Sequence, residues 1–307
     1  MNDNFHDKPR MSEELQTLHY LHLRNSLSSE DIQRYDTLHK GYEGEMKFYN
    51  LVTSTDTKGY FRFDFLFSSN GTEFQIDSLA INDQTITLFE VKYYAGDFIH
   101  DHNQWYLASN KQEIRNPLIQ LQRSEFLFRH LLRDTYPNVT IKAKLVFAHE
   151  DFMLYQAPLG IPAIFPNQLN RFLSSISSPK KYISKRVSNI ANHLASLHMP
   201  ESAYAKTVTY TYETVKKGIP CTSKCRSFLE KYAQTLLHCP TCGITLKNDD
   251  ALFTIIKEFH FLFPERKITT GAIHEWSNYT LSKRKILHFL NKHLKSVKKG
   301  RFTHYYF

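Results

Sequence analysis

The sequence predicts a mixed α/β protein: a mixed β-sheet flanked by helices, followed by a small cysteine module and a basic helical region. Three observations predict this fold class. Helical and strand-like segments alternate from residue 41 to about residue 178 in the order α–β–β–β–α–β, which is typical of a sheet covered by helices. All four cysteines lie between residues 221 and 242. Basic residues are concentrated between residues 266 and 301.

The sheet-forming domain is expected over residues 39–178, after an N-terminal extension of residues 1–38 whose modest apolar period suggests a helical arm. Its elements follow from hydrophobic periodicity and turn residues. In order they are a helix that starts within GYEGEMKFYNLV, a strand in YFRFDFLF, two strands in FQIDSLAINDQTITLFEVKYY, an amphipathic helix in NPLIQLQRSEFLFRHLLRD, strands in IKAKLVFAH and IPAIF, and a short helix in NQLNRFLSSI.

Three further regions complete the chain. Residues 179–215 are predicted to form a connector with one basic helix, PKKYISKRVSNIANHLASLH, and a β-rich segment, TVTYTYETVKK. Residues 216–248 hold the cysteines. Residues 249–307 are predicted to be helical and basic.

The charge of the chain points to an acidic partner. The formal net charge is +9 and the pI is about 9.2, so nucleic acid is the first expected partner and an anionic membrane surface the second. No apolar run approaches the ~18 residues that a membrane span requires, and the first residues are too polar for a secretion signal. We therefore expect a cytoplasmic protein without membrane association, in which cysteines bind metal rather than form disulfides.

Three charged residues occupy the two strands of residues 74–94, which otherwise look buried. If the turn is centred between residues 83 and 84, cross-strand partners have numbers that sum to 167. Asp77 then faces Glu90, and Gln75 faces Lys92, on the face that also carries the apolar pairs 79–88 and 81–86. Two carboxylates about 5 Å apart repel each other unless a hard cation such as Mg²⁺ binds them. Lys92 could then orient a water or offset charge on a phosphate.

The alternative is a solvated ion-pair cluster on a structural hairpin, because a Glu-x-Lys pattern on a strand is short and common. The spacing alone does not separate the two interpretations.

A wider set of motifs favours the metal site. GYEGE (41–45), QID (75–77), FEVK (89–92), Gly96, Trp105 and NPLIQ (116–120) together resemble the nuclease-related domain, NERD. That family is similar to the PD-(D/E)xK nucleases of restriction-endonuclease-like fold. The proline of the superfamily name is absent, because Ile76 precedes Asp77, but this position is commonly apolar in the NERD family.

The resemblance implies a role for five residues. Asp77 and Glu90 would bind Mg²⁺ or Mn²⁺, Lys92 would be the catalytic lysine, Glu45 a supporting acid and Gln120 a polar helper. Two of these assignments have simple alternatives: Glu45 could be a first-turn acid stabilised by the helix dipole, and Gln120 could merely cap or decorate its helix.

The cysteine spacing predicts a zinc site. Three residues separate Cys221 from Cys225, and two separate Cys239 from Cys242 in the string CPTCG. Two such pairs suit a tetrahedral Cys₄ zinc ion of the zinc-ribbon type, with Gly243 permitting the turn after the last ligand. With four protein ligands the metal would be structural. The alternative is four unlinked thiols.

The C-terminal region predicts three helices and a hairpin, a pattern similar to a winged helix-turn-helix. Asp249 or Asp250 would cap the first helix and Thr269 or Thr270 the second. The third, SKRKILHFLNKHL, would direct Ile286, Leu287, Leu290 and Leu294 inward and the nucleic-acid-binding candidates Lys283, Arg284, Lys285, Lys292 and Lys295 outward.

Ten Lys or Arg residues and one acid lie between Arg266 and Arg301, so this window carries +9, the net charge of the whole chain. Such concentration favours phosphate contacts, although a solvated basic face would look the same.

These observations favour a metal-dependent nuclease that hydrolyses phosphodiester bonds, most simply in DNA. Two rivals follow from the same sequence. A DNA-binding protein could retain a nuclease fold without turnover. An adaptor could recruit proteins through the zinc module, but it would not need the basic window.

Overall fold

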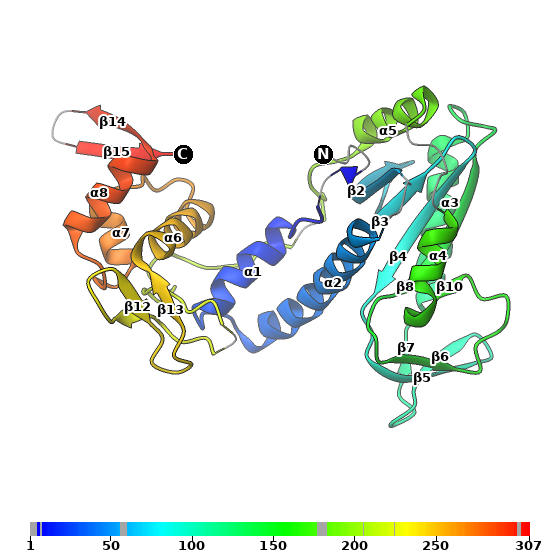
Figure 1. Cartoon of the computed structure of the whole chain (residues 1–307), viewed down its shortest axis with the longest axis horizontal. Helices are drawn as coiled ribbons and strands as arrows, with labels where there is room; N and C mark the ends of the chain where they lie inside the picture. The colour runs from blue at the N-terminus through cyan, green and yellow to red at the C-terminus, as the bar shows by residue number, and fades with distance from the viewer. Residues whose placement is uncertain are drawn as a thin grey trace. The chain divides into compact units, whose positions relative to one another are not determined.

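The computed structural model of the chain describes residues 5–6, 8–55, 60–176, 183–204, 206–223, 225–299 and 302–307. The chain forms two compact units (Figure 1). The first unit contains Met1–Met11 and Thr37–Ala205, and the second contains Ser12–Asp36 and Lys206–Phe307. Among the described residues, no helix combines the length and the apolar character that crossing a bilayer requires.

A six-stranded mixed sheet forms the centre of the first unit, as predicted. The order is β1-β2-β3-β4-β8-β10, in which β2–β3 and β3–β4 are antiparallel and the other neighbours are parallel. The strands are β1 (Phe5–His6), β2 (Tyr60–Ser69), β3 (Thr72–Ile81), β4 (Thr85–Lys92), β8 (Thr140–Phe147) and β10 (Ala163–Ile164). The hairpin β3–β4 thus lies in the middle of the sheet, and the short strands β1 and β10 form its two edges.

Helices cover both faces of this sheet. α3 (Pro117–Leu132) and α5 (Lys185–Leu197) share one apolar core with it, while α2 (Ser29–Ser54) and α4 (Leu169–Ile176), which follows the 3₁₀ turn η1 (Pro166–Gln168), share another. Asn116 fixes the start of α3, because its side chain accepts a hydrogen bond from the Leu118 N–H at 2.9 Å.

A second, four-stranded sheet was not expected from the sequence. Its order is β7-β6-β5-β9, from β5 (Gly96–Asp101), β6 (Gln104–Leu107), β7 (Glu113–Ile114) and β9 (Phe152–Tyr155). Trp105 on β6 is fully buried and joins this sheet to the core shared with α3. Strands of two to six residues carry too little alternation to be recognised in sequence.

One predicted helix boundary and one predicted β-rich segment are wrong. α2 begins at Ser29 rather than within GYEGEMKFYNLV, so Gly41 and Gly44 lie inside a 26-residue helix. A Cβ added to Gly44 would lie 2.7 Å from the Cβ of Tyr93, so glycine allows α2 to approach the end of β4. The segment TVTYTYETVKK forms no strand among its described residues; Tyr212 and Val215 are instead buried in the core of the second unit.

The side-chain alternation of β2 and β3 reverses midway. In β2, Phe61 and Phe63 face the core of α2 and α4, whereas Phe65 and Phe67 face the core of α3 and α5. Asp64, between them, has a left-handed φ of 57°. Such a residue rotates the following side chains to the other face of the sheet.

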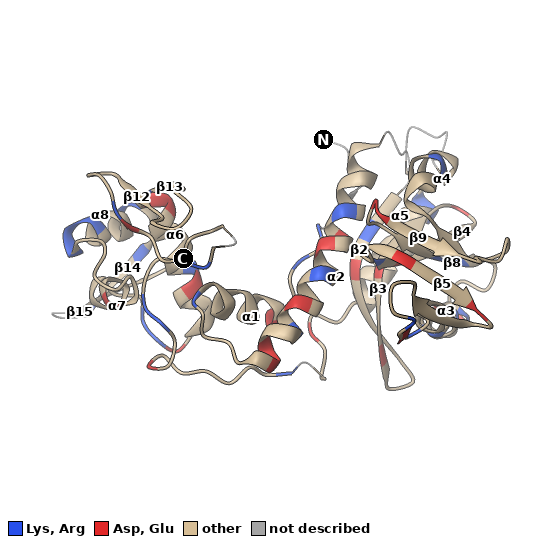
Figure 2. Cartoon of the chain, turned by 90° about the horizontal axis from the view of Figure 1, so that it is seen from below, with Lys and Arg blue, Asp and Glu red and all other residues tan. Residues whose placement is uncertain are grey.

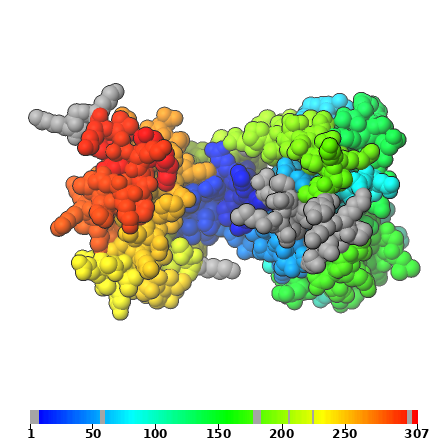
Figure 3. Space-filling model, turned by 45° about the horizontal axis from the view of Figure 1, so that its top comes forward, coloured from blue at the N-terminus to red at the C-terminus, as the bar shows by residue number. Residues whose placement is uncertain are grey.

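The second unit has one continuous core. It contains α1 (Glu13–Leu23), α6 (Asn248–Leu262), α7 (Thr270–Trp276), α8 (Lys283–His293), the small sheet β11 (Glu230–Lys231), β12 (Leu236–His238) and β13 (Thr245–Lys247), and the hairpin β14 (Lys295–Lys299) and β15 (Phe302–Tyr306). Buried residues of α1, the cysteine module and the three C-terminal helices belong to one apolar cluster. Figure 3 shows the cysteine module, in yellow, packed against the helices in orange and red.

The predicted order of three helices and a hairpin is present in this unit. The side chain of Thr269 caps α7, as expected. The predicted cap of α6 is wrong: Lys247 occupies the cap position, and Asp249 and Asp250 lie in the first turn, where their charges favour the helix dipole. Leu287, predicted to point inward, is 44% exposed.

Candidate functional site

The hairpin β3–β4 has the predicted register for four residue pairs. The pairs from Ser78–Phe89 to Ile81–Ile86 all sum to 167, and the ladder ends there. The expected pairs Asp77–Glu90 and Gln75–Lys92 lie outside it, because the side chain of Asp77 takes the place of a backbone partner. Its Oδ2 accepts a hydrogen bond from the Val91 N–H at 2.7 Å.

The candidate catalytic residues on β4 and α3 are in direct contact. Lys92 Nζ donates to Glu90 Oε1 at 2.8 Å and to Gln120 Oε1 at 3.0 Å. Gln120 reaches the strand because the Asn116 cap places it in the first turn of α3. Asp77 and Glu90 are only 8% and 3% exposed, so these side chains are not the solvated ion-pair cluster that the sequence left open.

The carboxylates of this site interact with one another electrostatically. Burial and the charges of Glu90 and Glu45 raise the pKa of Asp77. Burial and the charges of Asp64 and Glu90 raise the pKa of Glu45 to about 8. Burial lowers the pKa of Lys92, but Glu90 and Asp77 outweigh it, so the net shift is upward. The lysine therefore stays protonated beside several acids.

Glu45 is not a first-turn helix acid, because α2 begins at Ser29, far upstream of it. It contributes to the site from the middle of a helix. The closeness of Gly44 and Tyr93 brings this part of α2 against the end of β4, next to Lys92.

Asp64 is a further acid that the sequence analysis did not single out. The register of β2 and β3 places it opposite Asp77, at the position where both strands reverse their alternation. Gln75 donates to its Oδ1 at 3.4 Å, and burial raises its pKa. The sequence did contain a sign of this residue's importance, because Asp64 is the one acid in the largely aromatic and apolar strand segment YFRFDFLF.

The chemistry of these oxygen donors fits a divalent cation. The described site has several carboxylates and one cation, Lys92. The pKa values of Glu45 and Asp77 are raised partly because neighbouring carboxylates repel one another when ionised, and a bound hard cation would relieve this repulsion. Among the described residues, only the cysteines place three or more ligand atoms within 4.8 Å of one another. An ion at Asp77 and Glu90 would therefore take further ligands from water, as Mg²⁺ commonly does.

The four cysteines form a compact cluster in the second unit. Their sulfurs lie 3.6 Å apart for Cys221–Cys242, 3.4 Å for Cys225–Cys239 and 3.7 Å for Cys225–Cys242, and none forms a disulfide. A tetrahedral zinc ion with bonds of about 2.3 Å separates its sulfur ligands by about 3.8 Å. Gly243 has the left-handed φ of 74° that the turn after Cys242 requires. The residues fit a structural zinc ion.

The candidate nucleic-acid-binding residues of the second unit lie mainly at the surface of α8 (Figure 2). Ser282 caps the helix, and Lys283 and Arg284 are exposed in its first turn. Lys292 is exposed in its last turn, and Lys295 is exposed at the start of β14. Lys285 differs, because it is half-buried and its ammonium donates to the Gln234 carbonyl of the cysteine module. It therefore has a structural contact.

Comparison with known proteins gives one match. Residues 40–148, about a third of the chain, match the family model of the nuclease-related domain, NERD. No curated protein and no solved structure matches the chain. The matched residues include every member of the cluster formed by Glu45, Asp64, Asp77, Glu90, Lys92 and Gln120.

Proposed function

Residues 40–148 belong to the nuclease-related domain family, and we propose that the chain is a metal-dependent nuclease that hydrolyses phosphodiester bonds in DNA. One observation carries this proposal: Asp77, Glu90 and Lys92 meet at one buried end of the β3–β4 hairpin, with Gln120 and Glu45 supplied by two helices.

Each residue has a definable part in the reaction. Asp77 and Glu90 would hold Mg²⁺ or Mn²⁺, which when bound activates water and offsets phosphate charge. The Val91 N–H holds Asp77 in place, and the Glu90 charge keeps Lys92 protonated. Lys92 can then orient the attacking water or offset charge on the scissile phosphate, and Gln120 fixes its position. Glu45 supplies further negative charge.

The basic residues of α8, together with Lys295 at the start of β14, would hold the nucleic acid. Lys283, Arg284, Lys292 and Lys295 are exposed, whereas the contact of Lys285 with Gln234 makes it a weaker candidate. Contacts with phosphates make binding strongly dependent on salt. Removal of the whole region after residue 248 would cut through the single core of the second unit, so substitution of the four exposed residues is the appropriate test.

The function is tested by measuring cleavage of duplex and single-stranded DNA and of RNA, with Mg²⁺, with Mn²⁺ and without added divalent metal. A strong chelator would also strip zinc, so omission of the metal is the cleaner control. Asp77→Ala and Glu90→Ala should abolish cleavage, and Lys92→Ala should lower kcat while metal binding is retained. Cleavage that persists in Asp77→Ala would refute the assignment.

A DNA-binding protein without turnover is the second candidate. It predicts that the chain binds DNA and that no combination of metal and nucleic acid gives products. Loss of DNA binding on substituting the α8 residues separates both candidates from an adaptor. A cytoplasmic location belongs to the same proposal, and it is supported by cysteines that cluster as metal ligands rather than form disulfides.

A further inference from the structure

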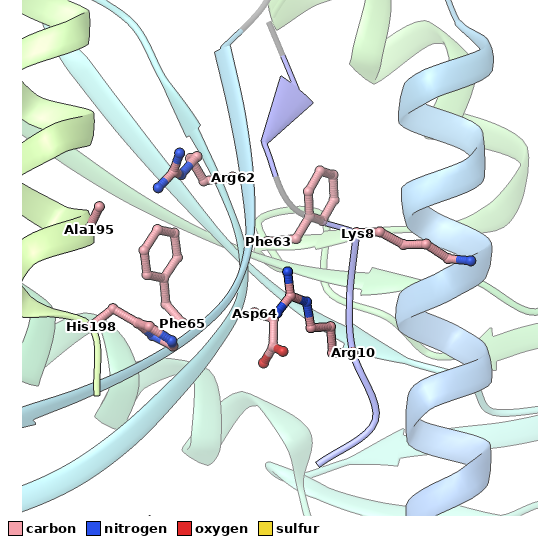
Figure 4. Close-up of a pocket in the computed structure, with 8 residues that line it drawn as sticks. All are labelled: Lys8, Arg10, Arg62, Phe63, Asp64, Phe65, Ala195 and His198. Atoms are coloured by element: carbon pink, nitrogen blue, oxygen red, sulfur yellow. The ribbon is translucent and has the colours of Figure 1, made fainter. Parts of the chain in front are cut away.

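A cavity of about 300 Å³ lies at the edge of the central sheet in the first unit (Figure 4). It is lined by Lys8, Arg10, Arg62, Phe63, Asp64, Phe65, Ala195 and His198. Lys8, Arg10 and Arg62 are cationic, and Asp64 is the one acid among the lining residues. None of the basic residues was singled out by the sequence analysis.

The chain assembles this cavity from three segments. β1 is the edge strand and pairs with β2, and Lys8 and Arg10, which follow β1 in the chain, lie beside Asp64 of β2. Arg62 belongs to β2 itself. His198 follows α5, and its Nδ1 accepts a hydrogen bond from the Leu66 N–H at 3.2 Å. Lys8 and Arg10 are therefore part of the cavity wall.

Asp64 connects the cavity to the candidate active site. The backbone N–H of Arg10 donates a hydrogen bond to the Asp64 carboxylate, and the register of β2 and β3 places Asp64 at the position opposite Asp77. The Asp64 charge also acts on Glu45 more strongly than the Glu90 charge does. The same carboxylate is thus hydrogen-bonded to the basic wall, and its charge acts on Glu45 of the candidate site.

The cationic groups are spread along the cavity. Figure 4 shows Arg62 on the side of α5, Arg10 beside Asp64, and Lys8 extending towards α2. Neither Lys8 nor Arg62 has an ion-pair partner among the described residues, and Lys8 and Arg10 are exposed. A single small anion would need converging donors, whereas a row of separated cations matches successive phosphates of one strand.

We propose that Lys8, Arg10 and Arg62 form a track for the sugar–phosphate backbone of the substrate strand, next to the scissile position. This inference rests on the proposed nuclease function. The track would hold the phosphates that flank the cleaved one, so that the carboxylates of Asp77 and Glu90 meet a single phosphate. It differs from the α8 surface because it belongs to the catalytic unit.

The test compares two full-length double variants, each lacking two positive charges. Lys8→Ala with Arg62→Ala removes the unpaired ends of the track. Arg133→Ala with Lys142→Ala removes exposed charges at the C-terminal end of α3 and on β8. Binding of a labelled DNA duplex is measured from about 50 to 200 mM salt without added divalent metal, so that cleavage does not interfere.

The plot of the logarithm of the binding constant against the logarithm of the salt concentration should become shallower by about 0.9 for each lost phosphate contact. This change is expected in the Lys8/Arg62 double variant only. The KM for cleavage should rise with little change in kcat. The proposal would be overturned if both double variants had equal slopes, or if the Lys8/Arg62 variant had the slope of wild type. Lys8→Gln with Arg62→Gln and thermal unfolding of each protein exclude a folding defect.

This design separates the two levels of the proposal. A wild-type chain that cleaves no nucleic acid refutes the nuclease function, while the salt slopes still report on phosphate contacts. A wild-type chain that cleaves, together with a Lys8/Arg62 variant indistinguishable from its control, refutes the track alone.

Discussion

At the scale of single residues, Gly44 fixes how closely α2 approaches β4. A Cβ there would lie 2.7 Å from that of Tyr93, whereas a Cβ on Gly41 meets nothing within 4 Å. We expect Gly44→Ala to lower the free energy of unfolding of the first unit by about 1–3 kcal/mol, and Gly41→Ala to raise it by up to about 1 kcal/mol.

Urea denaturation of both variants measures these opposite changes. Gly44→Ala should also reduce cleavage, because Glu45 would move with the helix. If the two alanines had the same effect on the unfolding midpoint, the close approach would not be a constraint.

Glu45 should make the first unit less stable as the pH rises. Its pKa is raised from 4.5 to about 8, so between these values the folded state binds a proton that the unfolded state has lost. The stabilisation is complete below about pH 4.5 and disappears as the pH passes about 8.

Without added divalent metal, the free energy of unfolding of wild type should therefore fall relative to that of Glu45→Gln between pH 5 and pH 8. Denaturant midpoints of the two proteins at several pH values give this difference. A constant difference across the range would mean that Glu45 titrates normally.

At the scale of elements, one buried ion pair links α1 to α6. Arg24 donates to both oxygens of Glu258, at 2.7 and 2.8 Å, and to the Lys216 carbonyl; its guanidinium lies 3.7 Å from the centre of the Trp276 ring. Arg24 and Glu258 are 0% and 1% exposed. Loss of either partner would leave a buried charge unpaired.

We expect Arg24→Ala to destabilise the second unit by about 3–5 kcal/mol. Arg266→Ala, which removes an exposed ion pair with Glu213, should cost at most about 1 kcal/mol. Chemical denaturation measures both. The double variant Arg24→Met, Glu258→Leu should recover much of the loss, and a failure to recover would assign the effect to packing against Trp276.

The sequence predicted elements where local signals agree. The hairpin register, the three C-terminal helices and the cysteine cluster follow from alternation, capping residues and spacing. Contacts between distant segments were not predictable, because no local pattern encodes the approach of Gly44 to Tyr93 or the place of Asp64 opposite Asp77. The alternation of TVTYTYETVKK predicted a strand, but burial of its aromatic side chains in a loop gives the same pattern.

At the scale of the whole molecule, the cysteine cluster is part of a larger core. Cys221 and Cys239 are fully buried in the apolar cluster that includes α1 and α6–α8. We expect one zinc ion per chain, and we expect Cys239→Ser to lose both the zinc and the helical signal of the second unit.

Elemental analysis, circular dichroism and limited proteolysis measure these losses, with Thr222→Ala as an exposed neighbouring control. A reductively purified chain without zinc, or with a disulfide among the four cysteines, would contradict the prediction. Retention of the helices in a zinc-free Cys239→Ser chain would show that the core is stable without the metal.

Because its alternation reverses at Asp64, β2 contributes side chains to two separate hydrophobic cores. Phe63 packs on the side of α2 and Phe67 on the side of α3, so the same strand walls two separate interiors. The two residues are about 13 Å apart along the strand. A cavity made by Phe63→Ala should therefore leave the packing of Phe67 unchanged. The losses in free energy of unfolding caused by Phe63→Ala and Phe67→Ala should then add in the double variant to within about 0.5 kcal/mol. A larger coupling energy, measured by denaturation of the four proteins, would mean that strain crosses the sheet from one interior to the other.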